Sequence, residues 1–182
     1  KHDPNQSGFM PGTIDGIRII HADRGNEEKA IKKIEKLLKK YFKTADEKQI
    51  AAIEEMLSKN RTISMIDPIL QSIRDNNRGI EPNKVVDLSF SLVKTSDNIE
   101  LINIVIGLLG LFDLGSAGEI ETVLATLALY DDFTLFAVVA ASNWTNGNRI
   151  IFRIAKNVVG WGKIHAVERL EAEDDEIREW IL

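Results

Sequence analysis

Two segments with the same apolar spacing decide the fold: DDFTLFAVVAA at Asp131–Ala141 and GWGKIHAVERL at Gly160–Leu170. At a shift of 29 residues (160 minus 131), the first segment places Leu135, Ala137, Val138 and Ala141 over Ile164, Ala166, Val167 and Leu170. An upstream segment, DNIELINIV at Asp97–Val105, matches Asp131–Val139 at a shift of 34 residues (131 minus 97). A repeat of about thirty residues predicts stacked pairs of helices.

Cap residues divide the chain into about nine or ten predicted helices. Three pairs have the spacing of a capping box, in which a side-chain oxygen accepts from the amide three residues on: Thr44 with Glu47, Asp97 with Glu100, and Ser116 with Glu119. Proline suits the first turn of a helix, so Pro68 and Pro82 predict two further helix starts. The predicted helices are 27–43, 45–58, one from 68, one from 82, 98–112, 117–129, 131–142, 149–159, 160–170 and one from 177.

The helix predicted at 27–43 is strongly amphipathic. Its apolar residues recur at three- and four-residue steps on one face: Ile31, Ile34, Leu37, Leu38, Tyr41 and Phe42. The opposite face carries a stripe of seven lysines: Lys29, Lys32, Lys33, Lys36, Lys39, Lys40 and Lys43. Such a stripe is usually a solvated face, and it also suits a polyanion or an acidic protein, so Lys29, Lys33, Lys36 and Lys40 are candidate interaction residues.

The two ends of the chain differ in character. Residues 1–25 are rich in turn-forming residues and predict a flexible leader, in which the run at 17–20 docks as one extended strand. Residues 26–182 predict a single helical domain, with regular repeats over 83–182. The sequence finishes on Trp180, Ile181 and Leu182, which predicts either that these residues fold back or that the natural chain continues.

Composition excludes several functional classes. The net charge of −5 argues against a general nucleic-acid-binding surface, and the absence of cysteine excludes disulfides, thiolate metal sites and a cysteine nucleophile. Charge is uneven, however: residues 27–61 carry ten basic and seven acidic residues, and residues 168–179 carry two basic and seven acidic. The apolar run at 101–112 is shorter than the roughly 20 residues of a membrane-spanning helix, so we expect no membrane association and take the cytoplasm as the default compartment.

No pattern of residues indicates catalysis. The three histidines lie far apart in sequence, and none is four residues from a carboxylate, as in a helical zinc site. The acidic group at 171–176 has the oxygen ligands that magnesium and calcium prefer, but carboxylates at the start of a helix explain it more simply. We therefore predict no catalytic residue, no metal site and no cofactor.

Two tryptophans and two arginines complete the candidate interaction residues. Trp144 lies in a predicted turn and Trp161 near a helix start, positions at which an indole either packs under a neighbouring repeat or anchors a partner. Packing is the favoured interpretation of both, with the N–H bonded to a carbonyl or to solvent. Arg149 and Arg153 form, with Lys156 and Lys163, the basic group of the repeat region.

The apolar spacing of Phe133–Ala141 and Lys163–Leu170, with the turns at 116–119 and 144–148, resembles that of HEAT and armadillo helical repeats. The resemblance covers about residues 83–182 and concerns the fold alone. It implies a right-handed superhelix of stacked antiparallel helix pairs. The period is shorter than the usual 40 or so residues, and no proline opens each first helix.

Proteins of this class mostly bind other macromolecules along the groove between stacked helices. The resemblance therefore implies a non-catalytic scaffold or adaptor with a protein partner. The alternative is a nucleic-acid-binding protein or DNA glycosylase, as some HEAT-like repeats are, with Arg149, Arg153, Lys156 and Lys163 as the basic group. Trp144, Asp131 and Asp132 would then be the neighbouring aromatic and acidic residues.

Overall fold

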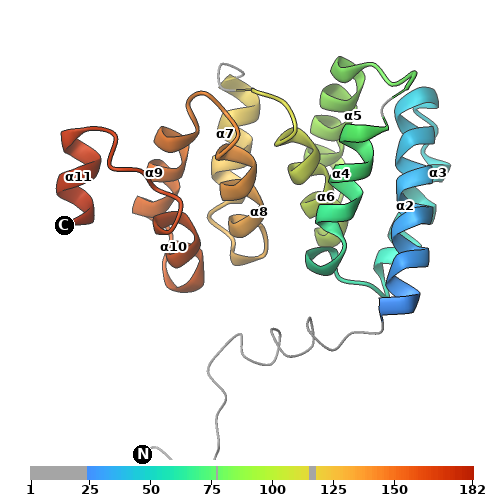
Figure 1. Ribbon diagram of the computed structural model, residues 1–182, viewed down its shortest axis with the longest axis horizontal. Coiled ribbons are helices and arrows are strands. Elements are labelled where there is room, and N and C mark those ends of the chain that lie inside the picture. The colour runs from blue at the N-terminus through green and yellow to red at the C-terminus, as the bar shows by residue number, and fades with distance from the viewer. Residues whose placement is uncertain (1–23, 77, 115–117) are drawn as a thin grey trace, which may run out of the picture.

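The computed structural model describes residues 24–76, 78–114 and 118–182, which form ten α-helices and one 3-10 helix and, within those ranges, no strand (Figure 1). The predicted all-α class is confirmed. The elements are α2 (Arg24–Thr44), α3 (Lys48–Leu57), η1 (Thr62–Ser64), α4 (Ile66–Asp75), α5 (Pro82–Thr95), α6 (Ile99–Leu109), α7 (Gly118–Leu127), α8 (Asp131–Ala141), α9 (Gly147–Asn157), α10 (Gly160–Val167) and α11 (Asp175–Ile181). Of the predicted leader, residues 24 and 25 belong to α2; the rest, with the strand at 17–20, lies outside the described residues.

The helices are arranged in two layers (Figure 1). In the first layer α2, α4, α6, α8 and α10 follow one another, and each helix contacts the next. In the second layer α3 packs on α2, α5 on α6, α7 on α8, and α9 on both α8 and α10. Helix α2 lies at one end of the row and α11 at the other. The right-handed superhelix stays a prediction.

Helix α6 forms the centre of the core. Eight of its eleven residues are buried, because α3, α4, α5 and α8 surround it. Gly107 in α6 and Gly110 directly after it allow close packing: a Cβ on Gly110 would lie 2.7 Å from Cα of Ala140 in α8, and one on Gly107 would lie 2.8 Å from Cδ1 of Ile66 in α4. A helix enclosed by neighbours is apolar on all sides, which explains the run at 101–112.

The predicted amphipathic helix is confirmed as α2, and its apolar face is buried against α3 and α4. The side chains of Ile34, Leu38, Tyr41 and Phe42 are almost fully enclosed. The lysines on the opposite face are exposed except for Lys39, which is partly buried and donates a hydrogen bond of 2.8 Å to Oγ of Ser72.

Two of the three predicted capping boxes are wrong. Thr44 instead ends α2, where its hydroxyl donates to the carbonyl of Lys40, and the Lys48 amide donates to the Asp46 carboxylate at 3.0 Å. The cap of α6 is Asn98, whose Oδ1 accepts from the Leu101 amide at 3.0 Å. Each helix begins one to three residues later than the box requires, because the preceding residues form the connection. Ser116 of the third box lies outside the described residues.

Packing does not bury every apolar position of the repeat segments. In α10, Ile164 keeps 44% of its surface exposed, whereas its counterpart Leu135 in α8 is partly buried. Ile99 at the start of α6 is 44% exposed, and Val139 in α8 is 41% exposed. These side chains belong to the first layer of helices, so the first layer presents apolar groups to its surroundings.

Candidate functional site

Two adjoining hollows lie along the first layer of helices. Residues of η1, α6 and α8 line both hollows, and residues of α10 also line the first. The first, here called the polar cleft, has a volume of about 470 Å³ and is lined by six polar side chains: Arg61, Glu100, Asn103, Asp131, Asp132 and His165. The second, here called the apolar groove, has a volume of about 330 Å³ and runs between α4, α6 and α8. Ile63, Leu135 and Phe136 line both, so the two hollows lie side by side.

The polar cleft lies where the first turns of three helices meet. Ile99 and Glu100 open α6, Asp131 and Asp132 open α8, and Trp161 stands at the second position of α10. The three successive first-layer helices α6, α8 and α10 therefore run in the same direction. A helix N-terminus carries a partial positive charge, and a carboxylate in the first turn is stabilised by it. The acidic residues in the first turns of α6 and α8 suit their own helix ends, and the fold brings them together at the cleft.

The carboxylate of Glu100 is already paired. Its Oε1 lies 2.8 Å from Nε of Arg61, and its Oε2 accepts from the Thr62 amide at 2.7 Å. The hydroxyl of the buried Thr62 also donates to the Glu100 carbonyl at 2.7 Å. These contacts hold η1 against the start of α6 and neutralise the charge of Arg61.

The carboxylates of Asp131 and Asp132 are exposed at the rim of the cleft, and neither makes an ion pair or hydrogen bond through its side chain with any described residue. Three carboxylates against one arginine give the cleft a formal charge of −2 (one minus three, with histidine neutral). The cleft is therefore acidic, and its two uncompensated charges stand side by side on one helix end.

Asn103 lies on α6 among apolar residues and forms the buried part of the cleft wall. Its side chain is 4% exposed, and its Oδ1 has no hydrogen-bond partner among the described residues. A buried polar atom without a partner is uncommon, since the loss of its hydrogen bonds to water costs about 1–3 kcal/mol. Asn103 was not predicted as a site residue, although it is the one polar residue that interrupts Leu101–Leu109.

Aromatic side chains cover the polar cleft at α10. Trp161 is 52% exposed, and its ring centre lies 6.4 Å from that of the partly buried His165. Gly162 allows α10 to approach α8, because a Cβ there would lie 3.2 Å from the side chain of Thr134. His165 is partly buried and lines the wall of the cleft, as does Phe136, which lies 29 residues earlier in the chain (165 minus 136).

Trp144 was predicted either to pack or to anchor a partner, and its burial contradicts the role of an anchor. The side chain is 4% exposed within the connection between α8 and α9, and its Nε1 has no hydrogen-bond partner among the described atoms. The favoured prediction of a packing role is confirmed, although the expected bond from its N–H is absent. Sequence could not separate the two tryptophans, because both stand beside helix starts.

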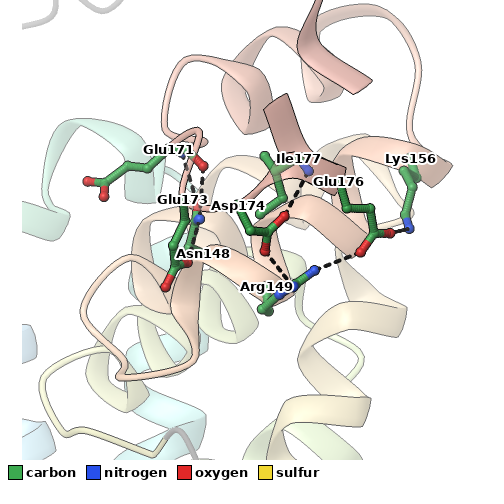
Figure 2. A network of polar contacts seen from close by, with 8 residues as sticks. All are labelled: Asn148, Arg149, Lys156, Glu171, Glu173, Asp174, Glu176 and Ile177. Atoms are coloured by element: carbon green, nitrogen blue, oxygen red, sulfur yellow. Dashed lines mark hydrogen bonds and ion pairs between the residues drawn. The ribbon is translucent and has the colours of Figure 1, made fainter. Parts of the chain in front are cut away.

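Arg149 and Arg153 lie on α9, in the second layer, and both are paired; Figure 2 shows the network around Arg149. Arg149 contacts Asp174 at 2.5 Å and Glu176 at 2.9 Å, and Arg153 contacts Glu121 at 3.2 Å. The hydrogen bond to Glu176 and the charge of Asp174 raise the pKa of Arg149. These arginines join α9 to α11 and to α7, and their side chains stay 52% and 47% exposed, so their role as interaction residues stays a prediction.

The acidic group at 171–176 is part of the same network (Figure 2). Asn148 donates to the Glu171 carbonyl at 2.9 Å and to the Glu173 carboxylate at 2.8 Å, and Lys156 lies 3.5 Å from Glu176. Asp174 caps α11 by accepting from the Ile177 amide at 3.0 Å. Within the described ranges, no group of three or more histidine, aspartate or glutamate side chains has the geometry of a metal site.

The lysines of α2 form a separate surface. Lys29, Lys33, Lys36 and Lys40 are exposed, and no carboxylate of the described chain pairs with them. Helix α2 lies at the end of the first layer farthest from α11 and outside both hollows (Figure 1). The structure thus brings Trp161, Asp131 and Asp132 to one site and leaves the lysines at another.

No described helix combines the length and apolar character needed to cross a membrane. Comparison of the chain with models of known protein families, with curated protein sequences and with solved structures finds no match. The site must therefore be interpreted from its own chemistry.

Proposed function

We propose that this chain is a non-catalytic protein-interaction module of the helical-repeat type, which binds a segment of a partner protein along the first layer of helices. The observation that carries this proposal is the set of exposed apolar side chains beside the two hollows. Trp161, Ile99 and Val139 are 52%, 44% and 41% exposed and line the hollows, and Ile164 follows on the same helix as Trp161.

The shape of the site supports a segment of chain rather than a compact small molecule. The polar cleft and the apolar groove share Ile63, Leu135 and Phe136 in their walls, and together they extend from the start of α10 to the end of α8. Interfaces of this kind gain most of their affinity from a few aromatic or aliphatic anchors in an apolar centre, with polar groups at the rim. Trp161 and Val139 are suited to the role of anchors.

The resemblance to HEAT and armadillo repeats supports the same function, because such proteins bind partners along stacked helices. The alternative of a DNA glycosylase has no support in the geometry of the residues expected for it. Arg149 and Arg153 are occupied in ion pairs, Trp144 is buried, and Asp131 and Asp132 lie in an acidic cleft that would repel phosphates.

Selection of peptides from a displayed random library on the immobilised protein tests the proposal. We expect an enriched family of peptides, whose synthetic members lose about tenfold in affinity when Trp161→Ala removes a central anchor. Val159→Ala is the matched control, since Val159 is 79% exposed just before α10 and lines neither hollow. The absence of any enriched family, or enriched peptides whose affinity does not change in Trp161→Ala, would reject the groove as the binding site.

A second function is favoured by the unpaired lysines of α2: binding of nucleic acid or of an acidic protein at that face. Duplex DNA labelled with a fluorophore should then raise its anisotropy at low salt, and the affinity should fall steeply as salt increases. The charge-reversal variant Lys33→Glu, Lys36→Glu, Lys40→Glu should lose this binding and keep the affinity for the selected peptides. No binding at low salt would eliminate the nucleic-acid function.

A further inference from the structure

We infer that the polar cleft binds the basic side chain of a lysine or arginine carried by the partner segment, while the adjoining apolar groove takes the apolar residues beside it. This inference rests on the proposed function and names the chemistry that the site selects. Three independent features of the cleft support a cation as the occupant: its charge, an unsatisfied buried acceptor and an exposed indole.

The charge comes from Asp131 and Asp132. Glu100 already has Arg61 at 2.8 Å and the Thr62 amide at 2.7 Å, so it adds little attraction for a ligand. The two aspartates have no partner in the described chain and are adjacent at the start of α8. Two neighbouring carboxylates at the rim of a partly apolar hollow attract an ammonium or guanidinium group more strongly than they would in open water.

The unsatisfied acceptor is Oδ1 of Asn103. The side chain is 4% exposed, lines the cleft, and makes no hydrogen bond through this oxygen with the described residues. A ligand rich in N–H donors would satisfy the carboxamide after a small rotation about its last bond. A carboxylate or phosphate would bring only further acceptors to this oxygen and to the two aspartates.

The third feature is Trp161, whose side chain is 52% exposed and lines the cleft together with Phe136. A cation within about 6 Å of an indole face is attracted by the ring electrons, and tryptophan is the best aromatic partner for this contact. The alkyl part of a lysine or arginine side chain also packs well on Ile99 and Phe136 while its charged end remains polar.

Three helix N-termini at the cleft raise the competing possibility of an anion site. Each N-terminus contributes roughly half a positive charge. Two of these ends are already compensated, however: Asn98 accepts from an amide of α6, and the two aspartates stand in the first turn of α8, whereas the start of α10 has neither a side-chain cap nor a carboxylate. An anion would have to displace or approach these carboxylates, so the cation is favoured.

The experiment uses four capped amino acids as probes and the whole chain labelled with ¹⁵N. Nα-acetyl-lysine N-methylamide and its arginine analogue should shift the Trp161 indole and Asn103 carboxamide resonances saturably. The norleucine analogue has the same chain length without the charge and should bind at least about fivefold more weakly, and the glutamate analogue should not bind. The variant Asp131→Asn, Asp132→Asn should weaken the lysine probe by about tenfold, and binding should fall with added salt.

Asp87→Asn is the matched control variant, since Asp87 is an exposed residue of α5 that lines neither hollow. It should leave the affinity for the lysine probe unchanged. Equal binding of the norleucine and lysine probes, tighter binding of the glutamate probe, or no saturable shift with the lysine probe would each overturn the inference. The same holds if the control weakens binding as much as the two aspartate changes do.

The selected peptides separate this inference from the proposed function. We expect them to share a basic residue at a fixed distance from an apolar one, and its replacement by norleucine should cost about tenfold in wild-type protein and almost nothing in the double aspartate variant. Peptides that bind at the groove without a basic residue would overturn the cation and leave the groove function standing. If the lysine probe binds saturably but no peptide is selected, the proposed function of the groove is wrong, and so is the inference that a partner segment supplies the cation.

Discussion

A single methyl group added to Gly110 should loosen the contact between α6 and α8. The Cβ of an alanine there would lie 2.7 Å from Cα and 2.9 Å from Cβ of Ala140. Neither atom belongs to the end of a flexible side chain, so one helix must move away from the other. Gly110 has φ −68°, which alanine adopts without strain, so the predicted effect comes from packing alone.

Two opposing contributions determine the size of the effect. Replacing glycine by alanine at a compatible position stabilises by about 0.4–1 kcal/mol, because the unfolded chain loses freedom. Overpacking of a filled core costs about 1–3 kcal/mol. The net result for Gly110→Ala is a loss of about 1–2 kcal/mol in the free energy of unfolding. The cost exceeds the gain because the clash is with backbone.

Two other glycines provide matched controls. A Cβ on Gly118, the first residue of α7, meets nothing within 4 Å, so Gly118→Ala should gain up to about 1 kcal/mol. A Cβ on Gly107 meets the side-chain ends of Ile66 at 2.8 Å and Leu70 at 3.1 Å, which can shift, so the effect of Gly107→Ala should lie between the other two.

Urea unfolding followed by circular dichroism measures all three variants. The midpoint should rise in the order Gly110→Ala, Gly107→Ala, Gly118→Ala, with similar dependence on urea concentration. A variant Gly110→Ala that is as stable as Gly118→Ala would refute the close approach of α6 and α8. Because these helices carry Asn103 and Asp131, that result would also remove the basis for the polar cleft.

Three further predictions concern other parts of the chain. Thr62→Val should lower the free energy of unfolding by about 1–2 kcal/mol, because the fully buried hydroxyl donates to the Glu100 carbonyl. Ser89→Ala should leave the free energy of unfolding unchanged or raise it by up to about 1 kcal/mol, because that buried hydroxyl has no partner among the described residues. Equal losses in urea unfolding would contradict both. Ile177→Ala should accelerate hydrogen exchange of the α11 amides and leave that of the α6 amides unchanged, because Ile177 is the buried residue of α11, all of whose residues are described. A uniform acceleration in both helices would show that α11 does not open by itself. The hydrogen bond from the Lys48 amide lowers the pKa of Asp46 below its ordinary value of 3.8. The stabilisation from this hydrogen bond is therefore present above pH 3.8 and is lost as the pH falls through the folded-state pKa. An NMR titration of Asp46 that gives an ordinary pKa would contradict this.

The candidate site was predicted less well than the helices. Trp161 was a candidate and lies at the cleft, but Trp144 is buried and Arg149 is paired with α11. Asn103 was missed, although a lone polar residue in a continuous apolar run is a signal that a buried amide has a special role. Asp131 and Asp132 were expected only as the acidic residues of the alternative function; they stand in the first turn of α8, and this local role does not prevent them from forming a cleft.

Local sequence determined which residues form helices and which face of each helix is apolar. The spacing of Ile34, Leu38 and Phe42 requires one buried stripe on α2, and Pro82 starts α5, because both features depend on neighbours within a few residues. Tertiary structure alone decided which apolar faces are covered. Contacts such as Glu100 with Thr62 and Arg149 with Glu176 join residues 38 and 27 positions apart, and no helical period relates them. The polar cleft exists because α6, α8 and α10 run in the same direction, which brings three separate helix starts to one place.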